Sequence, residues 1–562
     1  MNYSQQAEAL ARHLSILPFR DHFAALAAGG SDDLLEASIL DEAARFTKDV
    51  LDPIAATLDR EGARVVDGRV SLSPTHKDAW DAFCGMGWLA MAEPQPLGQG
   101  LSLALLTACE ELFNRASAPF YMLATSSRTA ACVLSKAAPP AIADQWVPKL
   151  LSGEWSATIC ISEPDAGSDV GRIRAQARNS GDGWRVAGEK CWISYGDHDL
   201  TPRIGHMALA RSTNGVGVRG LSLFLIPSSQ DDGTANGVVL RRVEHKLGLH
   251  CSPTCQIGFE NSRAILVGDE GRGLQTLFEM MLLMRLSCGP QGTGVASASY
   301  AVALGYAQDR KQGGPPDSPP VPIIEHTDVQ RQLLDMAATV ELTRGLNLVT
   351  AQVLDLDRRS RDATQAAAWT DLAQFLLPLV KDGSAWAAFN TASAAVQVLG
   401  GAGYTCEWPV ERLLRDARVF PVFEGTTGIQ ALDLVHRRLW RDKRAGLTAF
   451  LDVIAKDAQA QPALAEAASV LDRTGSALAA LEDRPGEAEA GAVSFLELCK
   501  AVAHGWIAAR IVRLGGDDAT GLRMKAAAAF YLSELGARAA FQAHMALIGD
   551  ARLAGISALT AD

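Results

Sequence analysis

A carboxylate in an apolar segment about three quarters of the way along the chain has surroundings that suit it to proton abstraction. Glu424 follows the apolar run Val419–Phe423 and precedes Gly425. Apolar neighbours raise the pKa of a carboxyl group, and a raised pKa makes its carboxylate a better base near neutral pH. A lone glutamate is more often a helix cap or an ion-pair partner, so Glu424 indicates a catalytic base only in combination with other motifs.

Two further segments carry groups that suit a ligand-binding edge. Residues 161–169 (ISEPDAGSD) combine small residues, which let a ligand approach the backbone closely, with hydroxyl and amide donors. Residues 191–194 place the indole of Trp192 and the hydroxyl of Ser194 two residues apart, on one face of a strand. Standing alone, the first segment could equally be a plain β-turn.

Other motifs are incomplete. His245–Cys255 holds two imidazoles and two thiols but lacks the second cysteine pair of a structural zinc site, so we expect a turn and no metal. Gly401–Gly403 lacks the third glycine and the strand–helix context of a nicotinamide-binding fingerprint. Neither a Walker A sequence nor a G-x-S-x-G elbow is present.

The hydrophobic periodicity places these motifs on successive elements. Helical spacing, as in Leu34–Leu51 and Leu103–Phe113, gives way near Trp155 to short runs bounded by turn residues, which predict an antiparallel β-domain. The predicted strands are Thr158–Ser162, Trp184–Ala187, Cys191–Ser194, His206–Arg211, Leu221–Ile226, Val238–Arg242 and Cys255–Phe259. Helical spacing then returns, interrupted by a loop with four prolines at Gly313–Val321 and by a second break at Glu482–Gly491.

We therefore predict a mainly α protein with a central β-domain. The predicted parts are an N-terminal arm (1–31), an N-terminal helical domain (32–155), the β-domain (156–273), a four-helix bundle (274–440) and an added C-terminal helical domain (441–562).

Composition narrows the class of protein. The 562 residues are 48% hydrophobic and 21% charged, with a net charge of −12, which argues against a chain devoted to nucleic acid. Ten scattered cysteines indicate reduced thiols. Apolar runs such as Met280–Met284 and Phe375–Val380 are too short to span a membrane, and no export signal is evident, so we expect no membrane span and a cytoplasmic location.

Four of these segments together resemble the FAD-dependent acyl-CoA dehydrogenases. They are Ile161–Asp169, Trp192–Ser194, Gln397–Gly401 and Phe423–Thr426, which occur in the order of the family's motifs. The resemblance covers about residues 32–440 and implies the same fold. The C-terminal domain and the segment Glu244–Thr254 resemble a bacterial subgroup of the family.

The resemblance also implies roles for individual residues. Glu424 matches the catalytic base, which removes a Cα proton from a CoA thioester while hydride leaves Cβ for the flavin, giving a trans-2-enoyl-CoA. Residues matching FAD contacts are Ile159, Ile161, Ser162, Trp192, Ser194, Arg310, Thr426 and Gly428, with Gln397, Gly400 and Gly401 matching contacts to a neighbouring subunit's cofactor. Residues matching substrate-side positions are Ser168, Arg285 and Gly425.

Three positions depart from the family's usual residues. Phe423 replaces a frequent tyrosine, and Gly428 replaces a frequent glutamine that contacts the flavin. Met284 occupies the position from which some branches supply their base, and because methionine cannot accept a proton, Glu424 is the only candidate.

The resemblance further implies partners and a substrate range. We expect an acyl-CoA substrate, an electron-transfer flavoprotein as electron acceptor, a homodimer or higher homo-oligomer, and a place in fatty acid β-oxidation. The subgroup favours short, medium or thioether-bearing acyl chains such as 3-methylthiopropionyl, and Met281–Met284 would line the acyl pocket.

Three other functions are open to a chain of this kind. A DNA-associated flavoprotein of the alkylation-response branch would carry a basic tail, but Arg441–Asp562 has 13 basic and 15 acidic side chains. A flavin oxidase or monooxygenase on the same scaffold would usually lack a glutamate at position 424. A helical scaffold that has lost its flavin would not be expected to keep the flavin-facing positions.

Overall fold

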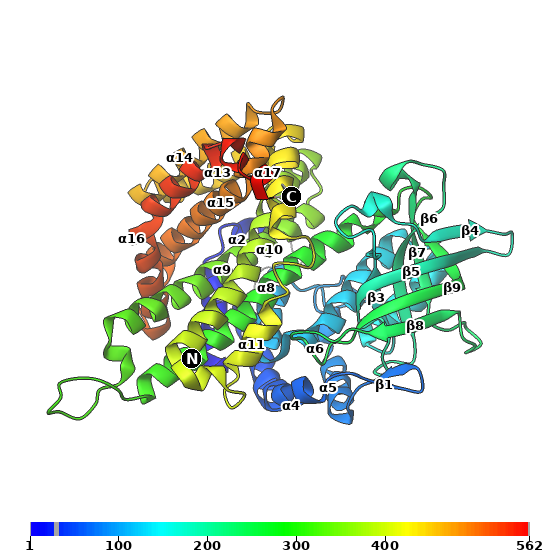
Figure 1. Cartoon of the computed structure of the whole chain (residues 1–562), viewed down its shortest axis with the longest axis horizontal. Coiled ribbons are helices and arrows are strands. Elements are labelled where there is room, and N and C mark those ends of the chain that lie inside the picture. Colours follow the sequence, from blue (N-terminus) through cyan, green and yellow to red (C-terminus); the bar gives the residue numbers. More distant parts are fainter. Residues whose placement is uncertain (1, 27–32, 560–562) are drawn as a thin grey trace. The chain divides into compact units, whose positions relative to one another are not determined.

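The computed structural model describes residues 2–26 and 33–559, which fall into two compact units (Figure 1). One unit comprises Met1–Thr47, Ser102–Arg115 and Arg285–Asp562, and the other comprises Lys48–Leu101 and Ala116–Met284. The predicted boundary between an N-terminal arm and the first helical domain, at residues 31 and 32, lies outside the described residues. The mostly helical fold with a central β-sheet confirms the predicted fold class.

The second unit is built on a seven-stranded sheet that closes on itself (cyan to green in Figure 1). Strand β6 pairs with β4 and β7, and the series β4–β5–β9–β7 completes the ring, with β3 added beside β6 and β8 beside β9. The strands are β3 (Ser156–Cys160), β4 (Gln176–Asn179), β5 (Trp184–Ser194), β6 (Ile204–Arg211), β7 (Leu221–Pro227), β8 (Val238–Val243) and β9 (Thr254–Val267). A closed ring leaves few unpaired strand edges.

The sheet is mixed, whereas the sequence predicted an antiparallel β-domain. Strand β3 runs parallel to β6, with Ser156 opposite Ile204, and β4 meets β6 in the same direction. Parallel neighbours need a long connection. The stretch from β3 to β6 provides one, because it contains the loop after β3 and the β4–β5 hairpin.

Two predicted strands form the single strand β5, because Gly188 does not end it. Gly188 has φ +149° and marks a register shift against β9. A Cβ at this position would stand 2.7 Å from Ala175, so the glycine permits close contact with the neighbouring segment. The strand β4 was missed, because Ala177 is its only buried residue and its sequence is otherwise polar. The short hairpin of β1 (Arg64–Val66) and β2 (Arg69–Ser71) was also missed.

Apart from the start of α8 (Gly273–Asp309), which belongs to this unit up to Met284, the helices of this unit precede the sheet in the chain. They are α4 (Ala55–Glu61), α5 (Pro74–Gly85), the second part of α6 (Leu103–Ala137) and α7 (Pro140–Ser152). Helix α6 is kinked at Ser117, whose φ of −155° and ψ of 93° are not helical. Pro119 lacks a backbone N–H and cannot bond the carbonyl four residues earlier, which accounts for the kink.

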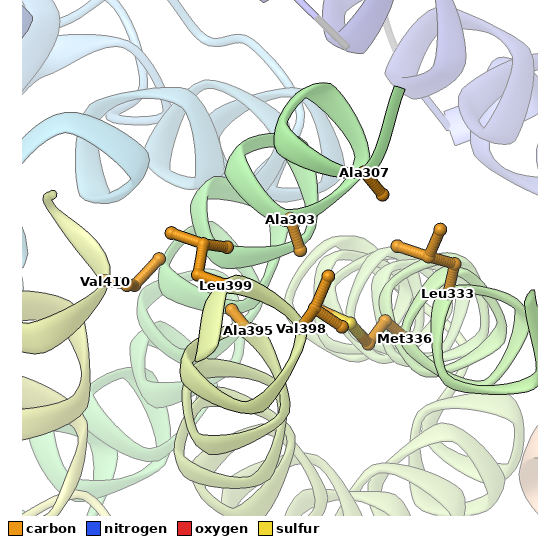
Figure 2. Close-up of a cluster of buried hydrophobic side chains, with 8 residues drawn as sticks. All are labelled: Ala303, Ala307, Leu333, Met336, Ala395, Val398, Leu399 and Val410. Atoms are coloured by element: carbon orange, nitrogen blue, oxygen red, sulfur yellow. The ribbon is translucent and has the colours of Figure 1, made fainter. Parts of the chain in front are cut away.

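The first unit contains the long helices of the predicted bundle. Helices α8 (Gly273–Asp309), α9 (Thr327–Arg359), α10 (Ala363–Leu399) and α11 (Val410–Ala417) all contribute side chains to one apolar cluster. Figure 2 shows its members: Ala303 and Ala307 from α8, Leu333 and Met336 from α9, Ala395, Val398 and Leu399 from α10, and Val410 from α11. The proline-rich segment Gly313–Val321 is a loop, as predicted, and is largely exposed.

The chain's two ends add further helices to this unit. The N-terminal helices are α1 (Tyr3–Ser15), α2 (Arg20–Leu26) and α3 (Asp33–Phe46). The C-terminal helices are α12 (Thr427–Leu432), α13 (Ala445–Ala458), α14 (Pro462–Ala479), α15 (Pro485–Leu514), α16 (Ala519–Leu547) and α17 (Ile556–Leu559), with a π-helical stretch at Asp433–Arg441. The predicted break at Glu482–Gly491 is shorter than expected, because Pro485 begins α15. Proline is well tolerated at the first position of a helix.

One helix in the described part of the chain, α15, is long and apolar enough to cross a membrane by length and composition. The sequence analysis missed it. In this structure 78% of its most apolar window is buried, and α15 packs between α14, α16 and the bundle helices α9 and α10. These contacts make it the core helix of the C-terminal domain.

Candidate functional site

Glu424 lies on a tight loop between α11 and α12, in the helical unit. Its backbone is left-handed at φ +52°, and Gly425 follows at φ +93°. A non-glycine residue in this region costs on the order of 1–3 kcal/mol, and such residues concentrate at functional sites. Thr426 caps α12, because its hydroxyl accepts a hydrogen bond from the amide of Ile429 at 3.4 Å. The chain therefore turns sharply at Glu424.

Two polar side chains hold this loop by its carbonyl groups. The Lys381 ammonium, from α10, donates to the carbonyls of Gly425 at 2.6 Å and Phe420 at 3.0 Å. The Gln430 side-chain amide, from α12, donates to the carbonyls of Glu424 at 3.1 Å and Gly425 at 3.3 Å. Lys381 and Gln430 are both fully buried. The strained backbone is thus fixed from two sides.

The electrostatic environment of Glu424 favours the protonated form more than water does. Burial raises the pKa of its carboxyl group, and the charges of Arg285 and then Lys381 oppose that rise without cancelling it. Burial also lowers the pKa of Lys381. The thiol of Cys288, on α8, has its pKa raised to about 12 by burial, with Glu424 adding to the effect, so it stays protonated. Glu424 is therefore the group here that can take up a proton.

In the β-unit, backbone contacts bring the two predicted flavin-facing segments together. The amide of Cys191 donates to the carbonyl of Ser162 at 2.9 Å. The hydroxyl of Thr158 donates to the carbonyl of Ser194 at 2.7 Å. Residues after the end of β3 therefore lie beside the end of β5.

Trp192 projects from this edge. It is 62% exposed and has a left-handed φ of +62°, within a register shift between Lys190 and Ile193. The neighbouring Ile193 is buried. The irregular strand thus turns the indole outward while its neighbour anchors the strand in the core.

The groups on this edge fit the flavin that the resemblance implies. Ile159 and Ile161 are half-buried, as are Ser162 and Ser194. An exposed indole and isoleucine side chains can contact the faces of a flat heteroaromatic ring, while hydroxyls and main-chain groups bond its polar edge. The residue types and their arrangement therefore suit a flavin.

The loop after β3 is anchored by a buried ion pair that the sequence analysis missed. The Lys190 ammonium donates to Glu163 at 2.8 Å and to the carbonyl of Ile161 at 3.0 Å. Glu163 also accepts from the amides of Arg174 at 2.6 Å and Ala175 at 3.1 Å. Burial lowers the pKa of Lys190, and Glu163 acts in the opposite direction. Glu163 in the predicted loop was a signal, but only the fold shows that Lys190 faces it.

The predicted substrate-side residues are divided between the units. Ser168 is exposed on the loop after β3, in the β-unit. Arg285 is half-buried on α8, and Gly425 lies beside Glu424, both in the helical unit. The charge of Arg285 therefore acts on the carboxyl group of Glu424, and Gly425 adjoins Glu424 in the chain.

A separate group of predicted residues lies at one end of the helical bundle. Arg310 follows the last residue of α8 and is exposed, and Gln397, Gly400 and Gly401 are exposed at the end of α10. The cluster in Figure 2 packs these two helix ends together. Gln397 lies 11 residues beyond Trp386, an α10 residue that contacts Thr427 at the start of α12, which is about 16 Å along a helix at 1.5 Å per residue. These residues are therefore distant from the Thr426–Gly428 turn, which lies at the start of α12.

Comparison with known proteins identifies the family. Three models, the N-terminal, middle and C-terminal domains of acyl-CoA dehydrogenase, match residues 35–154, 158–262 and 271–439. The chain is 37% identical to 3-methylmercaptopropionyl-CoA dehydrogenase from Ruegeria pomeroyi, over 87% of this chain and 88% of that protein. The chain belongs to the acyl-CoA dehydrogenase family. Membership makes it an FAD-dependent oxidoreductase and confirms the resemblance.

Other acyl-CoA dehydrogenases are similar over most of the chain. A butyryl-CoA dehydrogenase from Syntrophomonas wolfei is 29% identical over 83% of this chain and 79% of that protein. The structure of an acyl-CoA dehydrogenase with FAD from Bacillus anthracis is 20% identical, with a TM-score of 0.73 over 92% of this chain and 88% of that one. The latter shows the shared fold.

The cysteine- and histidine-containing segment His245–Cys255 is a structural turn in this acyl-CoA dehydrogenase. His250 contacts Asp59 at 3.0 Å, and Cys251 and Cys255 are buried. Across residues 2–26 and 33–559, no group of three or more His, Cys, Asp or Glu side chains is arranged to hold a metal ion. All ten cysteines are free thiols.

The residues that hold the loop around Glu424 were not predicted from the sequence either. Lys381 and Asp382 directly follow the apolar run Phe375–Val380 in a long helix. Charged residues are almost never buried unless paired, so their position was an available signal. The loop residues that they contact, however, lie 39 to 45 residues away and are brought close only by the fold.

Proposed function

We propose that this protein converts an acyl-CoA thioester to the trans-2-enoyl-CoA, with Glu424 as the base that removes the Cα proton. The observation that carries this assignment is Glu424 itself. It is a carboxyl group with a raised pKa on a left-handed backbone, held by Lys381 and Gln430. A fixed carboxylate of raised basicity can take a proton from a carbon acid that is held against it.

The residues that the resemblance assigns to FAD would hold the cofactor. The ring would contact Trp192 and the half-buried Ile159 and Ile161, with Ser162 and Ser194 at its polar edge. Arg310 carries a guanidinium suited to the pyrophosphate, and the Thr426–Gly428 turn presents the N-terminus of α12. When bound, FAD supplies the acceptor for the hydride that leaves Cβ.

The chain's own groups would bind and orient the thioester. The backbone at Glu424 and Gly425 is fixed, so its amide groups are pre-positioned to donate to a thioester oxygen. The charge of Arg285 opposes the rise in the pKa of Glu424 and so favours the ionised form of the base. Ser168 is available from the loop after β3 as a further polar contact.

The acyl chain we favour is short or medium in length, including thioether-bearing chains. Two similar proteins are named for 3-methylmercaptopropionyl-CoA and butyryl-CoA. Met281 and Met284 are half-buried on α8 and would give the pocket an adaptable wall. One methylene changes discrimination by about 1–3 kcal/mol, so a panel of chain lengths resolves the preference.

We further propose the family's usual setting for the reaction. Electrons would pass to an electron-transfer flavoprotein, the protein would be cytoplasmic and at least a homodimer, and its substrates would come from fatty acid β-oxidation. Free thiols at all ten cysteines agree with a reducing compartment.

The first experiment is an anaerobic titration of the purified flavoprotein with saturated acyl-CoA thioesters, including 3-methylthiopropionyl-CoA. We expect at least one thioester to bleach the flavin spectrum of the wild type, and Glu424→Gln to lose this response by at least 1,000-fold in rate while retaining FAD. Glu407→Gln is a matched control, because Glu407 is an exposed glutamate in the same domain.

Two outcomes would contradict the proposal. If no thioester bleaches the flavin, the proposed dehydrogenation of acyl-CoA thioesters is wrong, and rapid oxygen consumption with a non-acyl substrate would indicate an oxidase or monooxygenase. If Glu424→Gln is bleached as fast as the wild type, another group is the base. Salt-sensitive binding to duplex DNA would favour the alkylation-response alternative.

A further inference from the structure

A buried ion pair joins the C-terminal domain to α10, the helix that holds the loop around Glu424. This loop, between α11 and α12, is called the catalytic loop below. The ammonium of Lys500, on α15, lies 2.6 Å from a carboxylate oxygen of Asp382 on α10 and 2.7 Å from Glu497. Asp382 is fully buried and Lys500 is 6% exposed. Burial alone would lower the pKa of Lys500, but Asp382 and then Glu497 raise it above its usual value, so the ammonium stays charged.

The side chain of Lys500 runs closely over α10. A Cβ at Gly383, next to Asp382, would stand 3.4 Å from Cδ of Lys500. The family models stop at residue 439, so Lys500 lies outside the part of the chain that they match.

The second oxygen of Asp382 continues this contact to the catalytic loop. It accepts a hydrogen bond from the hydroxyl of Thr427 at 2.7 Å, and that hydroxyl in turn accepts one from the indole N–H of Trp386 at 3.0 Å. A hydroxyl has a single proton to donate. Because Trp386 donates to Thr427, the Thr427 proton is directed at Asp382, and the side chain has one orientation.

Thr427 is three residues from Glu424 and begins α12. The adjacent α10 residue, Lys381, holds the other part of the loop through the carbonyls of Phe420 and Gly425. Successive residues of α10 therefore hold the loop on both sides of Glu424. Only one of the two, Asp382, needs a cation from the C-terminal domain to balance its buried charge.

We infer that Lys500 is a positioning residue for the catalytic loop, acting through Asp382 and Thr427 on the backbone that carries Glu424. This inference rests on the proposed role of Glu424 as the base. A buried carboxylate without its cation is strongly unfavourable and takes up a proton, moves or draws in water. Each response weakens or redirects the hydrogen bond from Thr427 and releases one side of the loop.

The test compares Lys500→Met with Arg510→Met. The control removes a cation from another buried carboxylate of the same domain, since Arg510 contacts Asp457 at 3.0 Å, away from the catalytic loop. We expect Lys500→Met to lower the rate of flavin reduction at saturating acyl-CoA by 10-fold or more with KM changed less than 3-fold. We expect Arg510→Met to change both by less than 3-fold.

Hydrogen exchange gives a readout that does not depend on turnover. In Lys500→Met, backbone amides within residues 418–432 should exchange at least 10-fold faster than in the wild type, and in Arg510→Met they should not. If both variants leave this segment and the reduction rate unchanged, or if both alter them equally, Lys500 has only a structural role and the inference is wrong.

A double-variant comparison tests the route through Thr427. Thr427→Val should slow flavin reduction on its own, and adding Lys500→Met should slow it little further, because both changes remove the same support. If the two substitutions slow flavin reduction independently, so that their fold-changes multiply in the double variant, the route through Thr427 is wrong. If Lys500→Met does not fold, Asp382→Asn/Lys500→Met replaces it, because this pair leaves no unpaired buried charge.

The outcomes separate this inference from the proposed function. If the wild type is bleached by an acyl-CoA but Lys500→Met behaves like the Arg510→Met control, the proposed function stands and the inference fails. If the wild type is not bleached by any acyl-CoA, the proposed function fails, and unchanged exchange in Lys500→Met would then reject the mechanical link as well.

Discussion

At the scale of single residues, the protonation of Glu424 is set by burial and by two nearby cations. Burial raises the pKa of the carboxyl group, and Arg285 has the larger opposing effect. We expect Arg285→Gln to raise this pKa further. Because the base must be ionised to act, the acid limb of the pH profile of kcat/KM should move to higher pH.

The control for this change is Arg272→Gln, which removes an exposed arginine paired loosely with Asp269 at 3.9 Å. Its acid limb should match that of the wild type. An acid limb that moves to lower pH in Arg285→Gln, or that does not move, would show that Arg285 does not set the ionisation of the base. A rise in KM alone would assign Arg285 to substrate binding only.

At the scale of elements, a buried charge network fixes α1 and α6 to α9. The guanidinium of Arg344 contacts Glu111 at 2.6 Å and Glu341 at 2.7 Å, and His13 contacts Glu341 at 2.8 Å. We expect Arg344→Met to lower the free energy of unfolding by about 3–5 kcal/mol, because it leaves two buried carboxylates without their main cation. Urea denaturation at pH 7 would measure this loss.

The same network predicts a pH dependence. Burial would raise the pKa of Glu341, but Arg344 and His13 bring it down to about 2. A depressed pKa means that the stabilisation is complete above the unfolded value of about 4.5 and is lost as pH falls towards 2. The difference between wild type and Arg344→Met should therefore shrink in acid. Arg331→Met, which breaks an exposed pair on the same helix, should cost at most about 1 kcal/mol at any pH.

At the scale of the whole molecule, the exposed end of α10 should be covered by another subunit. Gly401 is exposed, and a Cβ there would meet no atom within 4 Å, so the isolated chain tolerates a side chain. We expect Gly401→Glu to leave the helical circular dichroism unchanged but to shift the protein towards monomer in sedimentation velocity and to weaken FAD retention.

Gly85→Glu provides the comparison, because Gly85 is also an exposed glycine at a helix end with open space around it. This variant should keep the oligomeric state and the FAD content of the wild type. If Gly401→Glu does the same, the subunit contact and the second cofactor contact lie elsewhere on the molecule.

The motifs of the candidate site could be recognised from the sequence, but the residues that hold those motifs in place could not. Each motif could be recognised as a short run of particular residue types, and the order of the motifs identified the family. The motifs lie around Ile161, Trp192, Gln397 and Glu424. Strand β4 and the parallel pairing of β3 with β6 were missed, since short polar strands carry little periodicity and pairing direction depends on distant segments. Gly188 seemed to end a strand that in fact continues past it.

By itself, then, the sequence determined the alternation of helices, sheet and helices and the identity of the candidate base, because these depend on residue type and local spacing. The tertiary structure alone decided that the backbone at Glu424 is left-handed, that Lys190 pairs with Glu163, and that Lys500 pairs with Asp382. A buried charge needs a partner, but the chain can supply that partner from more than 100 residues away, as it does at Asp382. A charged residue in an apolar segment of the sequence indicates that a partner is needed, and only the folded structure decides which residue is that partner.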